Sequence, residues 1–182
     1  HTLMEVLFMA VMPRSGGFST MDVADMSQST HLLMDVMMFI GGGSSSTAGG
    51  IKVTTVAVLV LAAYAEARGL TDVNVFGRRL TASTIKLSIS ILLTGATIVF
   101  VGTLVMLQIS DESLDRVLFE VISAFGTVGL SAGVSASVSE PGLYTLSVLM
   151  LIGRLGTITL AAALSMQDSA RLYRYPEERP VV

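Results

Sequence analysis

The 182-residue sequence contains no cysteine and no tryptophan, and it has only two histidines. The lack of cysteine excludes disulfide bonds, thiolate metal sites and cysteine nucleophiles. Charge is also scarce, because charged residues make up 14% of the chain, against about a quarter in soluble domains. With 52% hydrophobic residues and a net charge of −3, the chain cannot cover its surface with polar groups and has no basic footprint for nucleic acid. We therefore expect a surface that contacts membrane lipid and no nucleic-acid partner.

The hydrophobic runs predict several passages through a membrane. Leu87 to Ser110 holds 24 residues without a charge, and about 20 apolar residues are enough to span a bilayer. A second passage, His31 to Ala65, is interrupted by a segment rich in glycine and serine. A third, Pro141 to Gln167, is long enough to span but carries Arg154 at its centre.

Two shorter apolar segments, Thr2 to Met12 and Leu114 to Phe125, cannot cross a bilayer, and each ends at a turn that contains glycine. A short helix followed by irregular backbone at membrane depth is tolerated only where protein buries it or where it lines an aqueous cavity. These two segments therefore predict re-entrant helices.

The distribution of basic residues predicts the orientation. The connection between the second passage and the Leu87–Ser110 run is rich in arginine, as is the C-terminal tail, whereas the opposite connections are mainly acidic. Because basic loops stay on the cytoplasmic side, we expect a multi-pass protein of the cell (inner) membrane with the 68–85 linker and the C-terminus in the cytoplasm. The basic residues are Arg68, Arg78, Arg79, Lys86, Arg171, Arg174 and Arg179.

The glycine turns belong to an internal repeat. Each follows a short apolar helix that contains a phenylalanine and a glutamate, and each precedes a longer membrane passage. The second copy also has an outer helix, predicted over 82–107, which the first copy lacks, so we expect the chain to be part of a longer protein. In the alignment, Ser15, Gly16, Gly17 and Phe18 correspond to Thr127, Val128, Gly129 and Leu130.

The eight residues of the two turns are candidates for binding a monovalent cation. Such an ion must exchange its water shell for fixed oxygens, which backbone carbonyls supply when the chain is held extended and pointed inward. Glycine permits the required backbone angles. The alternative is a pair of ordinary helix C-caps, where glycine is also common, but two turns in matched contexts favour a filter.

Four motifs in order carry a resemblance to a known family. The run from Phe119 to Ser131 resembles the fourth pore loop of the Trk/Ktr/HKT superfamily of potassium transporters, and Pro13 to Ser19 resembles its third. The run from Met38 to Lys52 is similar to the broken inner helix of the third repeat, and Gly153 to Gly156 to the arginine-bearing inner helix of the fourth. The resemblance is closest to the bacterial Ktr and Trk subunits.

This resemblance implies an all-α polytopic membrane protein, with potassium-channel-like repeats of outer helix, pore loop and inner helix around one pore. Residues 1–67 would end the third repeat, 68–85 would form a cytoplasmic linker, 86–170 would form the fourth repeat and 171–182 a cytoplasmic tail. The other two filter strands would come from a missing N-terminal half. The implied partners are a second copy of the protein and a cytosolic nucleotide-binding regulatory subunit of the RCK type. The implied ion is K⁺ at the filter carbonyls, with Na⁺ and sodium coupling left open and no covalent cofactor.

The segment between the halves of the second passage resembles the family's intramembrane gate. Glycine would let it move, and its hydroxyl groups would satisfy freed backbone groups. It lacks the Gly-Lys-Ser/Thr of a phosphate-binding loop, and a static helix break is the alternative. Broken helices mark transport sites, so we predict a gate. The predicted gate residues are Gly41, Gly42, Gly43, Ser44, Ser45, Ser46, Thr47, Ala48, Gly49 and Gly50, with Lys52 and Arg154.

Single residues leave further alternatives. Arg154 either binds the gate loop or makes a structural pairing within the membrane. Asp35 is a candidate for attracting cations at the outer vestibule or for a subunit contact, and His31 is expected at the membrane interface. An intramembrane enzyme would need a nucleophile with a base or clustered histidines and carboxylates, which two histidines do not offer, so we predict no enzyme. A membrane subunit that serves assembly alone would not need paired glycine turns.

Overall fold

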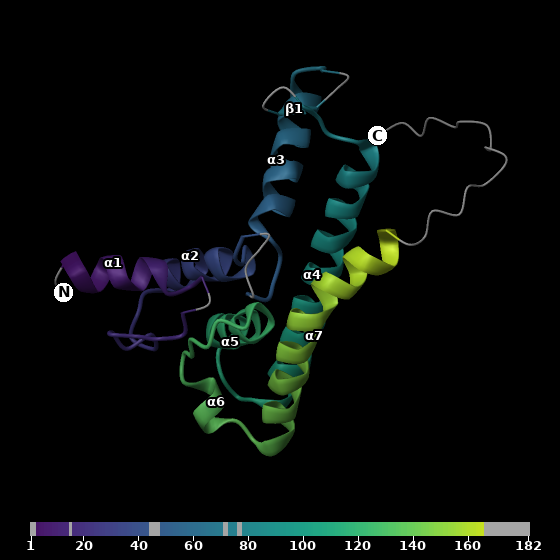
Figure 1. The fold of residues 1–182 in the computed structure, drawn as a ribbon. Helices are drawn as coiled ribbons and strands as arrows, with labels where there is room; N and C mark the ends of the chain where they lie inside the picture. The colour runs from purple at the N-terminus through teal and green to yellow at the C-terminus, as the bar shows by residue number, and fades with distance from the viewer. Residues whose placement is uncertain (1–2, 15, 44–47, 71–72, 76–77, 166–182) are drawn as a thin grey trace.

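The computed structural model describes residues 3–14, 16–43, 48–70, 73–75 and 78–165 (Figure 1). Apart from a two-stranded hairpin, the regular elements of these residues are helices. They are α1 (Leu3–Val11), α2 (Gln28–Phe39), α3 (Val53–Ala67), β1 (Asn74–Val75), β2 (Arg78–Arg79), α4 (Ala82–Ile109), α5 (Leu114–Gly126), α6 (Val134–Ser137) and α7 (Glu140–Ser165).

The uncharged run predicted to span a membrane lies in α4, except for its last residue, Ser110, which follows the helix. Thr81 caps this helix, because its side chain accepts a hydrogen bond from the backbone N–H of Thr84 at 3.4 Å. Among the described residues, α4 is the one helix both long and apolar enough to cross a bilayer. Its outward side chains include Leu93 and Phe100, which are exposed, as expected for a helix that contacts lipid.

Helix α5 lies at the centre of the molecule. It packs against α2, α4 and α7, and Figure 1 shows it below α2 and beside α7. Phe119 and Phe125 are among the largest fully buried side chains, and every residue from Phe119 to Gly126 is buried. The second half of this short apolar segment is therefore buried in protein, which is one of the two surroundings that irregular backbone at membrane depth tolerates.

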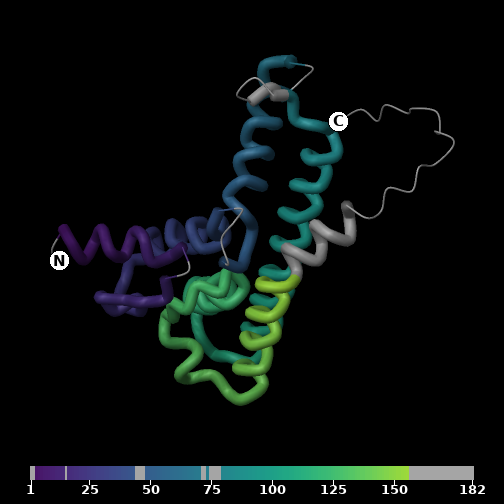
Figure 2. The backbone as a smooth tube through the Cα atoms, viewed as in Figure 1, coloured from purple at the N-terminus to yellow at the C-terminus, as the bar shows by residue number. Residues whose placement is uncertain are grey.

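Helix α1 is packed very differently. It projects from the body of the molecule beside α2 (Figure 2), and Met9 is its one buried residue among those described. Leu3, Met4 and Leu7 are exposed. A groove of about 760 Å³ lies between α1 and α2.

The second predicted passage is broken where expected. Helix α2 ends at Phe39 and α3 begins at Val53. A parallel bridge joins Ile40 to Ile51, with the backbone N–H of Ile51 donating to the carbonyl of Phe39 at 3.2 Å. Farther along, the N–H of Val53 donates to the carbonyl of Gly42, also at 3.2 Å. The two ends of the glycine- and serine-rich loop are thus held together at its base.

The connection between α3 and α4, treated as a linker in the sequence, contains the short antiparallel hairpin. Asn74 pairs with Arg79 and Val75 with Arg78. Gly69, with a φ of +65°, makes the turn that leaves α3, and glycine adopts this left-handed conformation without the steric cost that a Cβ would bring.

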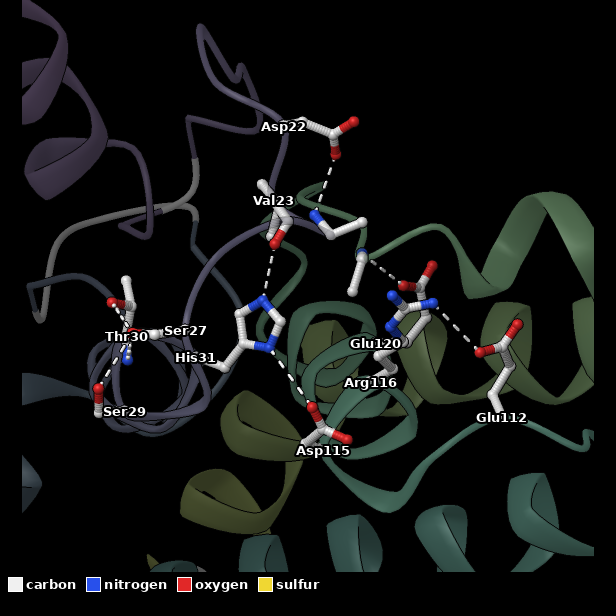
Figure 3. A network of polar contacts seen from close by, with 12 residues as sticks. Asp22, Val23, Ser27, Ser29, Thr30, His31, Glu112, Asp115, Arg116 and Glu120 are labelled. Atoms are coloured by element: carbon white, nitrogen blue, oxygen red, sulfur yellow. Dashed lines mark hydrogen bonds and ion pairs between the residues drawn. The ribbon is translucent and has the colours of Figure 1, made fainter. Parts of the chain in front are cut away.

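His31, which is expected at the membrane interface, is buried within the protein. Its side chain is 2% exposed, and its Nε2 donates to the carbonyl oxygen of Val23 at 2.7 Å (Figure 3). The ring also lies 5.1 Å from that of Phe119, and Nδ1 lies 3.9 Å from Asp115 Oδ2. Because α5 covers the first turns of α2, His31 is a buried contact between these helices.

Candidate functional site

The two glycine turns, far apart in the sequence, lie side by side. An alanine Cβ at Gly17 would lie 2.6 Å from the carbonyl oxygen of Val128 and 3.5 Å from the Cα of Gly129. In return, a Cβ at Gly129 would lie 3.3 Å from the Cα of Gly17. The structure therefore brings Gly17, Val128 and Gly129 together at backbone contact. Ser15, a further predicted member of this site, lies outside the described residues.

Both central glycines adopt conformations that side chains disfavour. Gly17 has a φ of +67° and Gly129 a φ of +94°. A residue with a Cβ would be strained at either position, and at Gly17 it would also collide with the facing backbone. Glycine at these two positions allows the turns to approach each other closely.

The fourth-repeat turn begins with a strained residue. Thr127 ends α5 in the left-handed region, with φ 50° and ψ 41°, which is unusual for a β-branched side chain. Its N–H donates to the carbonyl of Ala124 at 3.0 Å, and the N–H of Val128 donates to that of Ser123 at 2.9 Å. This is a helix C-cap in its hydrogen bonding, built on threonine instead of glycine. Strain of this kind costs about 1–3 kcal/mol and clusters at functional sites.

The carbonyl groups of this turn face different neighbours. The Val128 carbonyl oxygen points toward Gly17, as the close approach described above requires. The Leu130 carbonyl oxygen instead accepts a hydrogen bond from the Ser123 hydroxyl of α5 at 2.5 Å. Val128 therefore presents its oxygen to the neighbouring turn, whereas the oxygen of Leu130 is held by the helix behind its own turn.

A buried carboxylate lies behind the turn. Glu120 is 4% exposed, and its carboxylate accepts from the Ser131 hydroxyl at 2.9 and 3.0 Å and from the backbone N–H of Ala132 at 3.1 Å. Sequence reasoning used Glu120 only to align the repeats. The signal that could have identified it is a carboxylate embedded in the buried run of an otherwise apolar short helix.

The returning end of the predicted gate loop contacts the inner end of the same turn. The backbone N–H of Gly49 donates to the Thr127 hydroxyl oxygen at 3.1 Å. A Cβ at Gly49 would lie 2.8 Å from that oxygen, and a Cβ at Gly50 would lie 3.4 Å from the Cα of Gly126. Gly49 and Gly50 are buried, so this part of the loop packs directly against the end of α5.

The described part of the loop is more open at Gly43 than at its two ends. A Cβ at Gly43 would meet nothing within 4 Å, whereas Gly41 packs tightly against the carbonyl of Gly49. Lys52 donates from Nζ to the carbonyl of Ala48 at 3.4 Å and so contacts the loop at its base. Four predicted gate residues lie outside the described residues: Ser44, Ser45, Ser46 and Thr47.

Arg154 lies on α7 next to a tight contact between helices. Its neighbour Gly153 packs against the carbonyl of Phe125, where a Cβ would have no room. The Arg154 side chain is exposed. Between Arg154 and the described loop residues, 41–43 and 48–50, no hydrogen bond or ion pair forms, so its contact with the gate stays a prediction.

Comparison with known proteins gives a consistent result. The model of the TrkH family, described as cation transport protein, matches residues 1–175. Potassium uptake protein B of the Ktr system of Vibrio alginolyticus is 40% identical over 171 residues, which cover 94% of this chain and 37% of that protein. Potassium uptake protein D of the Ktr system of Bacillus subtilis (strain 168) is 38% identical over 176 residues, which cover 97% of this chain and 39% of that protein.

A third relative has a broader description. The potassium/sodium uptake protein NtpJ of Enterococcus hirae is 33% identical over 183 residues, which cover 97% of this chain and 40% of that protein. The chain thus spans about two fifths of the length of these curated relatives. The family and these relatives are transport proteins, so the prediction that the chain is not an enzyme is confirmed.

Proposed function

Because the chain belongs to the TrkH family of cation transport proteins, which lie in membranes, we propose that it forms part of a potassium-conducting pore. The observation that carries this proposal is the meeting of the two glycine turns, with the Val128 carbonyl oxygen directed toward Gly17. Carbonyl oxygens fixed in this way can replace the water shell of a monovalent cation.

The proposed filter consists of the two aligned turns. Residues 15–18 would supply the third-repeat strand and residues 127–130 the fourth, and the contact between Gly17 and Gly129 supports their arrangement around one axis. Two further strands would come from the remainder of the longer protein, so residues 1–182 alone would not conduct. A second copy of the protein would complete a homodimer.

The proposed gate is the loop 41–50. Its returning end lies against the inner end of the fourth-repeat turn, where the Gly49 N–H is bonded to the Thr127 hydroxyl. Movement of this end of the loop would break that bond and expose the inner carbonyls. Lys52 and Arg154 would set the position of the loop, with Lys52 already bonded to Ala48 at its base.

Potassium is proposed as the ion because the relatives from Vibrio and Bacillus are named potassium uptake proteins. The name of the Enterococcus relative includes sodium, so sodium remains an alternative cargo or a coupled ion. The basic residues of the α3–α4 connection, among them Arg68 and Arg79, support a cytoplasmic linker. A cytosolic nucleotide-binding subunit could bind on that side.

The experiment that tests this function is rubidium-tracer uptake by the full-length parent protein in a bacterium deficient in potassium uptake. Gly129→Asp places a side chain and a charge in the turn, and we expect loss of uptake with the protein still in the membrane. Gly69→Asp is the matched control, since Gly69 also has positive φ but a Cβ there meets nothing within 4 Å. Absent uptake by the folded parent with its regulatory partner would refute the transport function, and full uptake by Gly129→Asp would place the filter elsewhere.

A further inference from the structure

We propose that Glu120 and Ser123 form a clamp on the outer part of the fourth-repeat turn, and that this clamp sets the preference of the pore for potassium over sodium. The inference rests on the proposed function. Glu120 and Ser123 are positioning residues in this proposal, because they act on the backbone of the turn and do not contact the ion.

The clamp consists of hydrogen bonds from α5 to three consecutive residues. Ser123 holds the carbonyl of Leu130 at 2.5 Å. The carboxylate of Glu120 holds the hydroxyl of Ser131 at 2.9 and 3.0 Å and the N–H of Ala132 at 3.1 Å. Both oxygens of Glu120 are engaged, and its side chain is almost fully buried. Hydrogen bonds to a carboxylate are roughly twice as strong as those between neutral groups.

The spacing of the two residues explains why they act together. Residues three apart on a helix lie on the same face, so Glu120 and Ser123 both face the segment that leaves the turn. Their bonds anchor residues 130–132 behind the turn, while the Val128 carbonyl points away toward Gly17. The anchored segment therefore limits how far the carbonyls of the turn can move.

The positions of the third repeat that correspond to Glu120 and Ser123 carry apolar side chains. The register that aligns Gly17 with Gly129 places Phe8 where the fourth repeat has Glu120, and Val11 where it has Ser123. Neither side chain can form a hydrogen bond. Ser19, the counterpart of Ser131, donates to the carbonyl of Met21, and the one α1 side chain that its hydroxyl contacts among the described residues is the thioether of Met9, at 3.7 Å, which is a weak acceptor.

The fourth-repeat turn is also more deeply buried than the third-repeat turn at the position that follows the central glycine. Phe18 is 73% exposed, whereas its counterpart Leu130 is 3% exposed. Glu5 and Glu120, although both precede a glycine turn, are not equivalent in this register, since the two residues are not the same distance from their glycines. Of the two turns, the fourth-repeat turn is therefore the one that has a glutamate and a serine at the clamp positions.

Rigid carbonyls favour the larger ion. Sodium is smaller than potassium, and carbonyls must move inward to coordinate it as closely, which is the cavity-size account of selectivity. A turn anchored at its outer part resists this inward movement. Releasing the clamp should therefore raise sodium uptake relative to potassium uptake, which a residue needed only for folding would not do.

The test compares the ratio of rubidium to sodium uptake in the full-length parent and its variants, normalised to the amount of protein in the membrane. Glu120→Gln keeps the size of the side chain but removes its charge, so the bonds to Ser131 and Ala132 lose their charge assistance. We expect the ratio to fall about tenfold, as the loss of a charged hydrogen bond in a buried site implies. Glu120→Asp retains the carboxylate and should restore part of the ratio.

Ser123→Ala provides a second test that removes a single hydroxyl group. We expect the ratio to fall about threefold, since one neutral hydrogen bond is lost. Ser147→Ala is the matched control. Ser147 lines a pocket of about 200 Å³ together with Glu120 and Ser123, but its hydroxyl donates to the carbonyl of Leu143 in its own helix. Its ratio should match that of the parent.

The outcomes separate this inference from the proposed function. One pattern would overturn the clamp and leave the pore proposal intact. In that pattern the parent takes up rubidium and Gly129→Asp does not, but Ser123→Ala, at a normal amount of protein, has the same ratio of rubidium to sodium uptake as the parent. Equal losses of rubidium and sodium uptake in Glu120→Gln would overturn it too, because that pattern indicates a structural role. If the Glu120→Gln variant does not reach the membrane, the ratio of rubidium to sodium uptake in Ser123→Ala decides whether the clamp proposal stands. No uptake by the parent would refute both proposals.

Discussion

The two glycine turns share a central glycine in the left-handed region and contact each other, yet the protein supports them in different ways. The fourth-repeat turn follows α5, whose last eight residues are all buried, and its outer part bonds to Glu120 and Ser123. The third-repeat turn follows α1, in which Met9 is the one buried residue among those described. A matched motif therefore does not imply matched rigidity.

The difference follows from the surroundings of the two helices. Helices α2, α4 and α7 pack around α5, so its polar groups must find partners within the protein. Helix α1 has most of its apolar side chains exposed in the described structure. The comparison teaches that two turns with the same central glycine can be supported by different contacts from the helix before them.

The largest expected effect is at the point where the two turns touch. Gly17→Ala places a Cβ 2.6 Å from the Val128 carbonyl oxygen and forces alanine into a φ of +67°. Because the obstacle is backbone, we expect rubidium uptake to fall at least about tenfold, as strain of about 1–3 kcal/mol at the filter implies. Gly133→Ala is the control, since Gly133 also has a positive φ, of +94°, but a Cβ there meets nothing within 4 Å. Equal uptake by the two variants would show that the turns are not in contact in the working pore.

An intermediate effect is expected where the gate loop meets the fourth-repeat turn. Gly49→Ala brings a Cβ to 2.8 Å from the Thr127 hydroxyl and 3.1 Å from the Phe125 carbonyl oxygen. The returning end of the loop must then move away, so uptake measured without the regulatory subunit should rise about fivefold. Gly43→Ala, which adds a Cβ in open space, should leave it unchanged. A rise in both variants would mean that the loop responds to any loss of glycine.

A smaller effect is expected at Thr127 itself. Thr127→Val keeps the shape of the side chain but removes the acceptor for the Gly49 N–H, so uptake without the regulatory subunit should rise about threefold, as the loss of one hydrogen bond implies. Thr127→Ser keeps the acceptor and should behave like the parent. Combined with Gly49→Ala, the valine change should add little, because both release the same contact. Additive effects would refute a shared contact.

Much of the architecture followed from local sequence patterns. The uncharged run within α4, the break between α2 and α3, and the short helix α5 before its turn were all predicted, and the structure contains each of them. Family membership followed from four ordered motifs and agrees with the match over residues 1–175. The location of His31 could not be predicted, because it depends on α5 covering α2 and not on the residues beside His31.

Some residues of the candidate site could be predicted from the sequence, and others could not. Gly17 and Gly129 were predicted because glycine at a matched position is visible in the sequence. The role of Glu120 was not, since its partners Ser131 and Ala132 come 11 and 12 residues later, beyond the turn. The contact of Gly49 with Thr127 joins residues 78 positions apart, and no local pattern reports it.

The amino-acid sequence by itself determined the hydrophobic passages, the positions of the breaks and the two glycine turns, because these depend on residue type and spacing along the chain. Only the tertiary structure decided that the two turns touch, that Gly49 bonds to Thr127 and that Glu120 anchors one turn and not the other. Hydrogen bonds between distant residues form only after helices have packed and excluded water from the groups between them.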